Sequence, residues 1–211
     1  MDDNFVVINQ SSNLSNIMNE RIIKIIASIG LITGGLLGLA GSFAPTDLLR
    51  YIAWNIDGVG LIIACILLTL YYYKKGSDMT AAGFMIFALG ECAIVSSNSL
   101  HLEDNVYTFG AGTALWALSL LVISSQKTYS LFIRSTGILS AILFSIVTVL
   151  IFTDHPLNGL TRPLPFFAYP FFVITILGWA WSLWRPDTSN LKFAEIHVSA
   201  PEDKRRRTYD L

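Results

Sequence analysis

Long uninterrupted apolar blocks, separated by short polar connections, dominate the pattern of this sequence. Six blocks reach the roughly 20 residues that a helix needs to cross a bilayer. We place them at 22–44, 51–73, 79–100, 106–126, 131–153 and 163–184. Membrane-spanning strands alternate between lipid-facing and lumen-facing residues, and these blocks show no such alternation. The pattern predicts an all-α integral membrane protein, a compact bundle of six transmembrane helices.

Composition supports lipid as the solvent for much of the chain. Of the 211 residues, 53% are hydrophobic and 14% are charged, whereas a soluble domain carries about a quarter charged residues. A water-soluble core of this size cannot hide so much apolar surface. The bilayer is therefore the first partner that the sequence predicts.

The polar segments divide the chain into three parts. We expect a polar N-terminal tail at 1–20, a six-helix transmembrane domain at 21–185 and a polar, basic-ended C-terminal tail at 186–211. A short amphipathic helix or disorder would both fit the first tail. Within the sixth block, Pro170 removes one helical hydrogen bond and predicts a kink.

Basic residues predict the orientation of the bundle. With six spans, both termini share a side with the connections at 73–79 and 126–131. That side carries 12 of the 14 lysine and arginine residues, and the opposite side carries Arg50 and Arg162. Because basic residues concentrate on the cytoplasmic side, we expect both termini in the cytoplasm and the protein in the plasma (inner) membrane.

Small residues recur every four positions in the first block, at Gly30, Gly34 and Gly38. This spacing puts them on one helix face, where two helix backbones can approach closely. The face is expected to pack against a neighbouring helix of the same chain. The alternative is contact with a second copy or with another membrane subunit.

Aromatic residues gather near the ends of the predicted spans. An interfacial belt at headgroup level is their ordinary explanation. The residues interpreted in this way are Tyr51, Trp54, Tyr71, Tyr72, Tyr73, Trp179, Trp181 and Trp184.

Glu91 is the main anomaly, since it falls close to the middle of the third block. An ionised carboxylate at that depth costs at least about 2.5–3.5 kcal/mol. We expect a protonated side chain that is hydrogen-bonded to a neighbouring helix. Intramembrane ionisable groups are functional candidates by default, and an interhelical bond used only for packing is the alternative.

Other polar residues line up with Glu91. Asn98 lies two turns further along the same face, and His101 follows at the outer edge. Asn55 and Asp57 fall in the outer half of the second block. We predict a proton- or ion-binding site formed by Glu91 and Asp57, in a cavity that opens outward past Asn55, Asn98 and His101. Alternatively, Asn55 and Asp57 merely begin a helix that starts near Trp54.

A small transporter, or another proton- or cation-coupled membrane protein, is the function that these acids favour. The alternative is a non-catalytic accessory or assembly subunit of a membrane complex. A metal-dependent hydrolase is less expected, because HExxH and GxSxG motifs are absent from the sequence and the only metal candidates are His101, Asp154 and His155. No particular cofactor is indicated, and a net charge of −1 argues against a nucleic-acid partner.

Overall fold

The computed structural model describes residues 3–98 and 102–185, with side chains from Met18 to Asn98 and from Asp104 to Arg185. The predicted C-terminal tail at 186–211 lies outside this part. The described chain is helical throughout, apart from its connections. Its helices are α1 (Asp3–Ser42), α2 (Asp47–Lys74), α3 (Asp78–Ser97), η1 (Leu102–Asn105), α4 (Val106–Ser125), α5 (Leu131–Phe152), η2 (Phe166–Ala168) and α6 (Tyr169–Leu183).

Six of the described helices are long and apolar enough to cross a membrane. In the first of them the membrane-length segment is Met18–Ser42, and in the last it joins η2 to α6 as Phe166–Leu183. Their outward faces carry large exposed apolar side chains, such as Leu36, Ile66 and Val149. The prediction of an all-α chain with six candidate spans is confirmed at this level.

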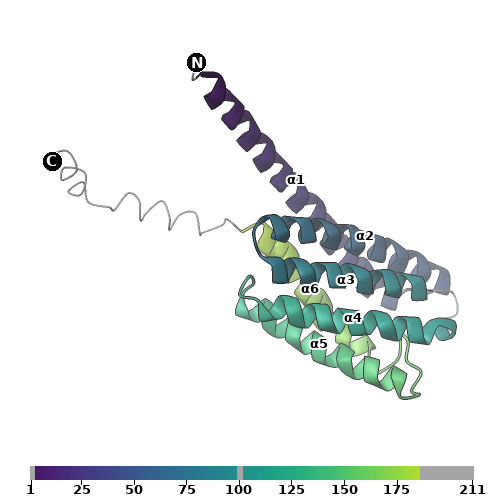
Figure 1. Ribbon diagram of the computed structural model, residues 1–211. Coiled ribbons are helices and arrows are strands. Elements are labelled where there is room, and N and C mark those ends of the chain that lie inside the picture. Colours follow the sequence, from purple (N-terminus) through teal and green to yellow (C-terminus); the bar gives the residue numbers. More distant parts are fainter. Residues whose placement is uncertain (1–2, 99–101, 186–211) are drawn as a thin grey trace, which may run out of the picture.

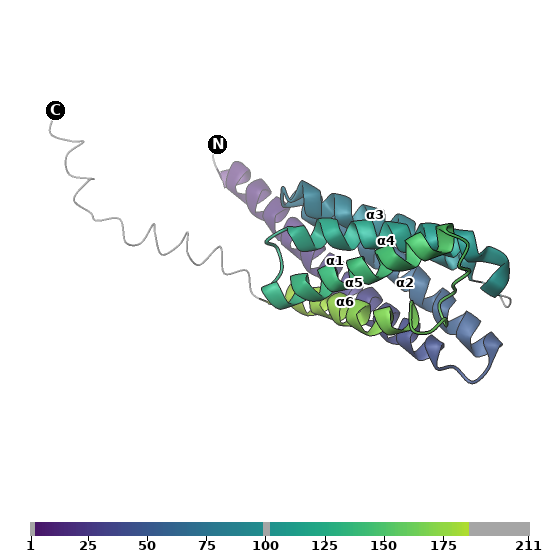
Figure 2. The ribbon, with the colours of Figure 1, turned by 90° about the horizontal axis from the view of Figure 1, so that it is seen from below.

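The helices form a closed bundle in which neighbours in sequence are neighbours in space. Each of α1 to α5 packs against the next, and α6 returns to pack between α5 and α1 (Figures 1 and 2). The beginning of α1 projects beyond the bundle as a continuous helix (Figure 1). This order brings residues from the two ends of the chain together at one end of the bundle.

The bundle has two chemically different ends. Lys24, Lys75, Tyr129 and Arg185 line one hollow, so the start of the first span, two connections and the end of α6 meet there. We call this the basic end. The connections at 43–46 and 153–165 lie at the opposite end.

The start of α2 differs from the prediction. The helix begins at Asp47, where Thr46 Oγ1 accepts a hydrogen bond from the Leu49 amide at 3.3 Å as an N-terminal cap. The predicted start at residue 51 is therefore late. Because Asn55 and Asp57 lie two to three turns inside the helix, the alternative in which they begin it is wrong.

The predicted kink at Pro170 is also wrong. Pro170 lies in the first turn of α6, which begins at Tyr169. A proline fits there because the first amide groups of a helix have no partner within the helix. Residues 163–165, predicted as part of the span, form a turn, and the span starts with the short helix η2 at Phe166.

Much of the predicted aromatic belt is in fact core. Trp54 and Trp179 are only 7% and 1% exposed, and Trp179 packs edge-on against Phe84 of α3 with ring centroids 5.1 Å apart. The belt interpretation fits the exposed side chains of Trp181 and Trp184. Aromatic side chains of α6 thus fill the centre of the bundle.

The face formed by Gly30, Gly34 and Gly38 packs against α2 of the same chain. A Cβ atom at Gly30 would lie 2.6 Å from the Gly60 carbonyl oxygen, and one at Gly34 would lie 2.4 Å from Leu61 Cγ. This face is therefore covered by α2 and is not free for a partner. An oligomer formed through another surface remains a prediction.

We predict that Gly30→Ala destabilises the bundle by about 1–3 kcal/mol, the usual range for overpacking. The added methyl group meets the rigid backbone of Gly60, so α1 and α2 must move apart. Equilibrium unfolding of the purified protein in mixed detergent micelles measures the change.

Gly35→Ala is the matched control, because its new Cβ atom would have ordinary contacts of 3.6 Å with Ile176 and Val173. Equal destabilisation by both substitutions would contradict close α1–α2 packing at Gly30.

Candidate functional site

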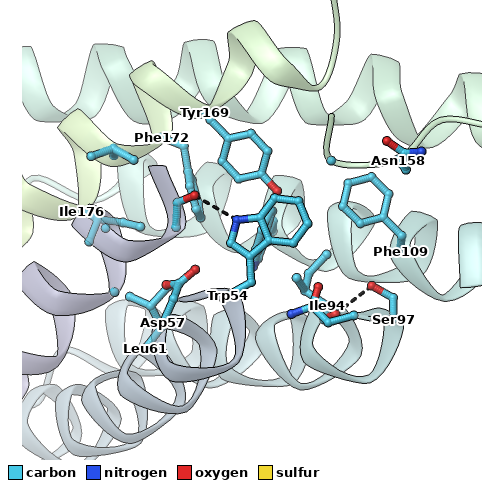
Figure 3. Close-up of a pocket in the computed structure, with 17 residues that line it drawn as sticks. Trp54, Asp57, Leu61, Ile94, Ser97, Phe109, Asn158, Tyr169, Phe172 and Ile176 are labelled. Carbon is cyan, nitrogen blue, oxygen red and sulfur yellow. Dashed lines mark hydrogen bonds between the residues drawn. The ribbon is translucent and has the colours of Figure 1, made fainter. Parts of the chain in front are cut away.

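A narrow pocket lies in the half of the bundle nearer the opposite end. Its walls come from α1, α2, α3, α4 and α6, and the connection at Asn158 and Gly159 contributes to its lining (Figure 3). The space open to water-sized spheres is about 30 Å³. A cavity that holds one water needs about 10–15 Å³, so the pocket is large enough for water.

Asp57 enters this pocket from α2. A Cβ atom at Gly38 of α1 would lie 2.6 Å from Asp57 Oδ2, and one at Gly34 would lie 3.2 Å from Oδ1. The missing side chains of these glycines make room for the carboxyl group. Asp57 Oδ1 is fully enclosed and has no hydrogen-bond partner among the described residues.

Trp54 forms the part of the wall above Asp57. Its indole Nε1 donates a hydrogen bond to the Gly38 carbonyl oxygen at 3.0 Å (Figure 3). Gly159 lies close to both Trp54 and the hydroxyl group of Tyr169, because a Cβ atom there would be 3.1 and 3.5 Å from them. The 153–165 connection therefore covers the pocket at its outer side.

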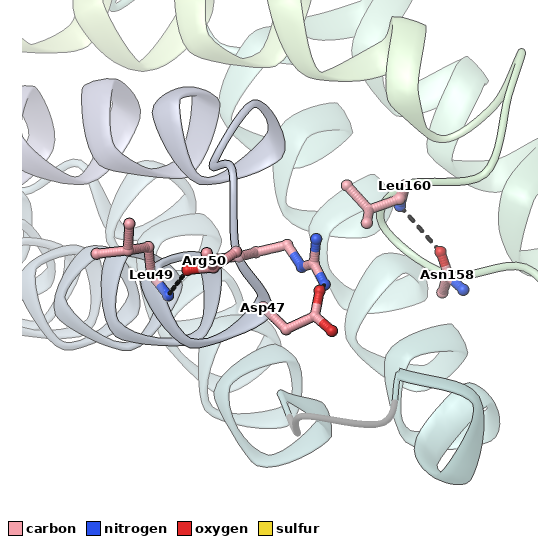
Figure 4. Close-up of polar contacts among 6 residues, drawn as sticks. Asp47, Leu49, Arg50, Asn158 and Leu160 are labelled. Atoms are coloured by element: carbon pink, nitrogen blue, oxygen red, sulfur yellow. Dashed lines mark hydrogen bonds and ion pairs between the residues drawn. The ribbon is translucent and has the colours of Figure 1, made fainter.

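Polar contacts order the rim outside Trp54. Arg50 pairs with Asp47, and its guanidinium carbon lies 5.9 Å from the centre of the Trp54 ring. Asn158 Oδ1 accepts a hydrogen bond from the Leu160 amide at 3.0 Å, which holds the connection in a turn (Figure 4). The Arg50 guanidinium group therefore lies at the rim of the pocket, on the far side of Trp54 from Asp57.

Glu91 lies behind the pocket wall, not in it. Trp116 of α4 lines the pocket, and its Nε1 donates a hydrogen bond to Glu91 Oε2 at 2.9 Å. The Glu91 side chain is 1% exposed. Its Oε1 atom faces Gly58 of α2, where a Cβ atom would be 3.3 Å away.

Glu91 lies nearer one end of its helix than the predicted span implied. It lies 13 residues from Asp78 but only six from Ser97, because α3 ends at Ser97 and not at residue 100. At about 1.5 Å per residue, the acid is about 9 Å from the C-terminal end of α3, which is the end nearer the pocket.

The acids Asp57 and Glu91 approach the same part of α2. Glu91 Oε1 faces Gly58, the residue that follows Asp57, and the Tyr169 hydroxyl lies beside Gly159. Tyr169 also lines the pocket. The pocket, the second acid behind it and this hydroxyl therefore form one polar centre in a largely apolar bundle.

Of the other predicted site residues, the pocket lining includes one. Asn98 lines the pocket, and its Nδ2 group is enclosed without a hydrogen-bond partner in the described part of the chain. Asn55 is not in the pocket lining, and its Nδ2 donates to the Tyr51 carbonyl oxygen of its own helix at 2.7 Å. His101 lies outside the described residues.

The weak metal candidates Asp154 and His155 are exposed in the connection after α5. His155 Nδ1 lies 2.9 Å from the Thr153 carbonyl oxygen. Within 3–98 and 102–185, histidine, cysteine, aspartate and glutamate form no group of three or more that could hold a metal ion. His101, the third candidate, cannot be placed relative to them.

Trp116 and Tyr169 are the site residues that sequence reasoning missed. Trp116 carried a usable signal, since it lies near the middle of its apolar block, away from any interfacial belt. Tyr169 carried no usable signal in the sequence, because its position next to Pro170 resembles an ordinary helix start.

Comparison of the chain with family profiles, with curated proteins and with solved structures returned no match.

We predict a coupling energy of about 0.5–2 kcal/mol between Glu91 and Trp116, the range for interhelical hydrogen bonds and contacting residues. A double-mutant cycle with Glu91→Leu and Trp116→Phe measures it by equilibrium unfolding in mixed micelles. Trp116→Phe keeps an aromatic ring but removes the indole donor.

The matched control cycle combines Glu91→Leu with Trp181→Phe. Trp181 is 64% exposed, so its effect should be additive with that of Glu91→Leu. Additivity in both cycles would show that the hydrogen bond contributes nothing to stability.

Proposed function

We propose that the protein is a small proton- or cation-coupled membrane transporter, in which Asp57 is the group that first takes up the ion. Two observations carry this proposal: Asp57 lines a pocket, and its Oδ1 atom is enclosed without a protein partner among the described residues. A buried polar atom is normally satisfied by protein, water or an ion. Here the pocket supports water or an ion as the partner.

Pocket size favours a small ion over an organic substrate. Typical small-molecule sites occupy about 300–1,000 Å³, whereas about 30 Å³ is open to water-sized spheres here. A proton carried by water, or a small cation that has lost its water shell, fits this space. An organic substrate does not fit without movement of the walls.

The neighbouring acids Asp57 and Glu91 provide a way to hold a proton or cation inside the bundle. Like charges at short range in a low dielectric disfavour simultaneous ionisation, so Asp57 and Glu91 are expected to share one negative charge. A proton or cation that arrives at Asp57 then changes the charge state preferred by Glu91. Trp116 stabilises the ionised form of Glu91, because its indole donates to Oε2.

The distribution of basic residues supports an orientation in which both termini lie in the cytoplasm. The membrane of the proposal is the plasma (inner) membrane. Lys24, Lys75 and Arg185 gather at the basic end, which positive-inside statistics favour as the cytoplasmic side. In this orientation the Asp57 pocket is nearer the external surface.

We predict that Asp57→Asn and Glu91→Gln each reduce ion uptake at least tenfold without loss of folded protein. Both changes keep the shape of the side chain and remove its ability to ionise. Uptake is measured in proteoliposomes by a trapped pH-sensitive dye, and by thallium entry as a test for monovalent cations.

Asp78→Asn is the matched control, since it removes an exposed acid from the helix of Glu91 at the end away from the pocket. Wild-type protein that gives no flux above empty liposomes under either gradient would contradict the transporter proposal. That result would favour the accessory-subunit alternative.

For orientation, we predict that a membrane-impermeant maleimide labels Pro45→Cys in intact cells and does not label Lys127→Cys until the cells are opened. Both positions are exposed in connections, at opposite ends of the bundle. A background with Cys65→Ala and Cys92→Ala removes the native thiols. The reverse labelling pattern would invert the proposed topology.

A further inference from the structure

A second hollow, separate from the Asp57 pocket, lies at the basic end of the bundle. Helices α1, α2 and α6 contribute to it together with the connection at 128–130. About 350 Å³ is open to water-sized spheres, which is within the range of small-molecule sites. Unlike the Asp57 pocket, it is lined by cations.

Two of these cations converge on a single acid. Lys24 Nζ and Lys75 Nζ lie 3.3 and 3.4 Å from the same oxygen, Oε1 of Glu20. Both also lie over the ring of Tyr71, at 5.3 and 4.8 Å from its centre. With Arg185 in the lining, three cations surround the hollow and one carboxylate is shared between two of them.

Hydroxyl groups complete the lining. Ser77, Thr128, Tyr129 and Ser130 all contribute to it, and Tyr129 lies 2.8 Å from Tyr72, oxygen to oxygen. Burial raises the pKa of the Tyr129 phenol, so this group adds no negative charge to the hollow. Cations together with hydroxyl donors are the usual groups that recognise a phosphate.

The hollow lies at the depth of lipid headgroups. Tyr73, Trp181 and Trp184 come from the same ends of α2 and α6 and are 60–68% exposed. Exposed tyrosine and tryptophan side chains mark the membrane–water interface. A phosphate group that enters the hollow can therefore come from the surrounding lipid or from solution.

We propose that this hollow binds a phosphate group, held by Lys24, Lys75 and Arg185 and supplied by an anionic lipid headgroup or by free phosphate. The site does not depend on the proposed transport function, because it shares no lining residue with the Asp57 pocket. Binding there would tie the ends of α1, α2 and α6 together.

The test compares the double variant Lys24→Gln/Lys75→Gln with the control Arg21→Gln/Lys127→Gln. Both remove two positive charges from the same end, but Arg21 and Lys127 are not in the lining. Each protein is reconstituted in phosphatidylcholine nanodiscs, with added phosphatidylglycerol in one arm and inorganic phosphate in the other. The thermal midpoint is titrated in each arm, and native mass spectrometry counts retained phosphatidylglycerol.

We expect saturable stabilisation of the wild type and the control, and an affinity at least tenfold weaker in the lysine variant. Stabilisation by phosphatidylglycerol alone identifies a lipid headgroup as the source. Stabilisation by phosphate alone, or by both ligands, identifies a site that accepts the free ion. The proposal is overturned if neither ligand stabilises the wild type, or if the control loses as much affinity as the lysine variant.

Discussion

Helices in hydrocarbon gain little from burying apolar surface against one another, so the bundle depends on close backbone contact. Gly30 approaches Gly60 at the α1–α2 contact, and Gly58 admits Val95 and Glu91 of α3. These contacts bring α1, α2 and α3 near enough for short side chains to meet across them. The pocket exists because the same glycine face leaves room for the Asp57 carboxyl group.

Polar side chains inside the bundle otherwise bond to carbonyl groups of their own helix or to side chains of another element. Hydroxyl contacts of 3.0–3.1 Å join α3 to the connection between α4 and α5, α4 to α5, and α5 to α6. Against this background, the enclosed atoms of Asp57 and Asn98 stand out. The hydroxyls of Ser28 and Ser124 also lack a partner in the described structure, but an unpaired hydroxyl costs far less than an unpaired carboxylate.

Helix number and type were readable because apolar blocks of bilayer length have one stable form in lipid. The position of a side chain along the bundle axis, and whether it faces the core or the outside of the bundle, could not be read from the sequence. Trp54 and Trp179 look like belt residues in sequence, yet they turn inward, because lipid and core are equally apolar and leave no periodic signal. The helix starts at Asp47 and Tyr169 depend on a local cap and a proline turn. Glu91 was identifiable as a buried acid, but its partner Trp116 depends on how α3 and α4 pack.

Unequal helix lengths give the protein a preferred bilayer thickness. α3 and α4 each have 20 residues, or about 30 Å, while the last span has 18, or about 27 Å. α2 has 28 residues, or about 42 Å, so it must tilt or extend beyond the hydrocarbon. A thick, sterol-rich membrane has a hydrocarbon core longer than these short helices, and adapting to this mismatch costs elastic energy. The short helices therefore match a hydrocarbon core of about 27–30 Å.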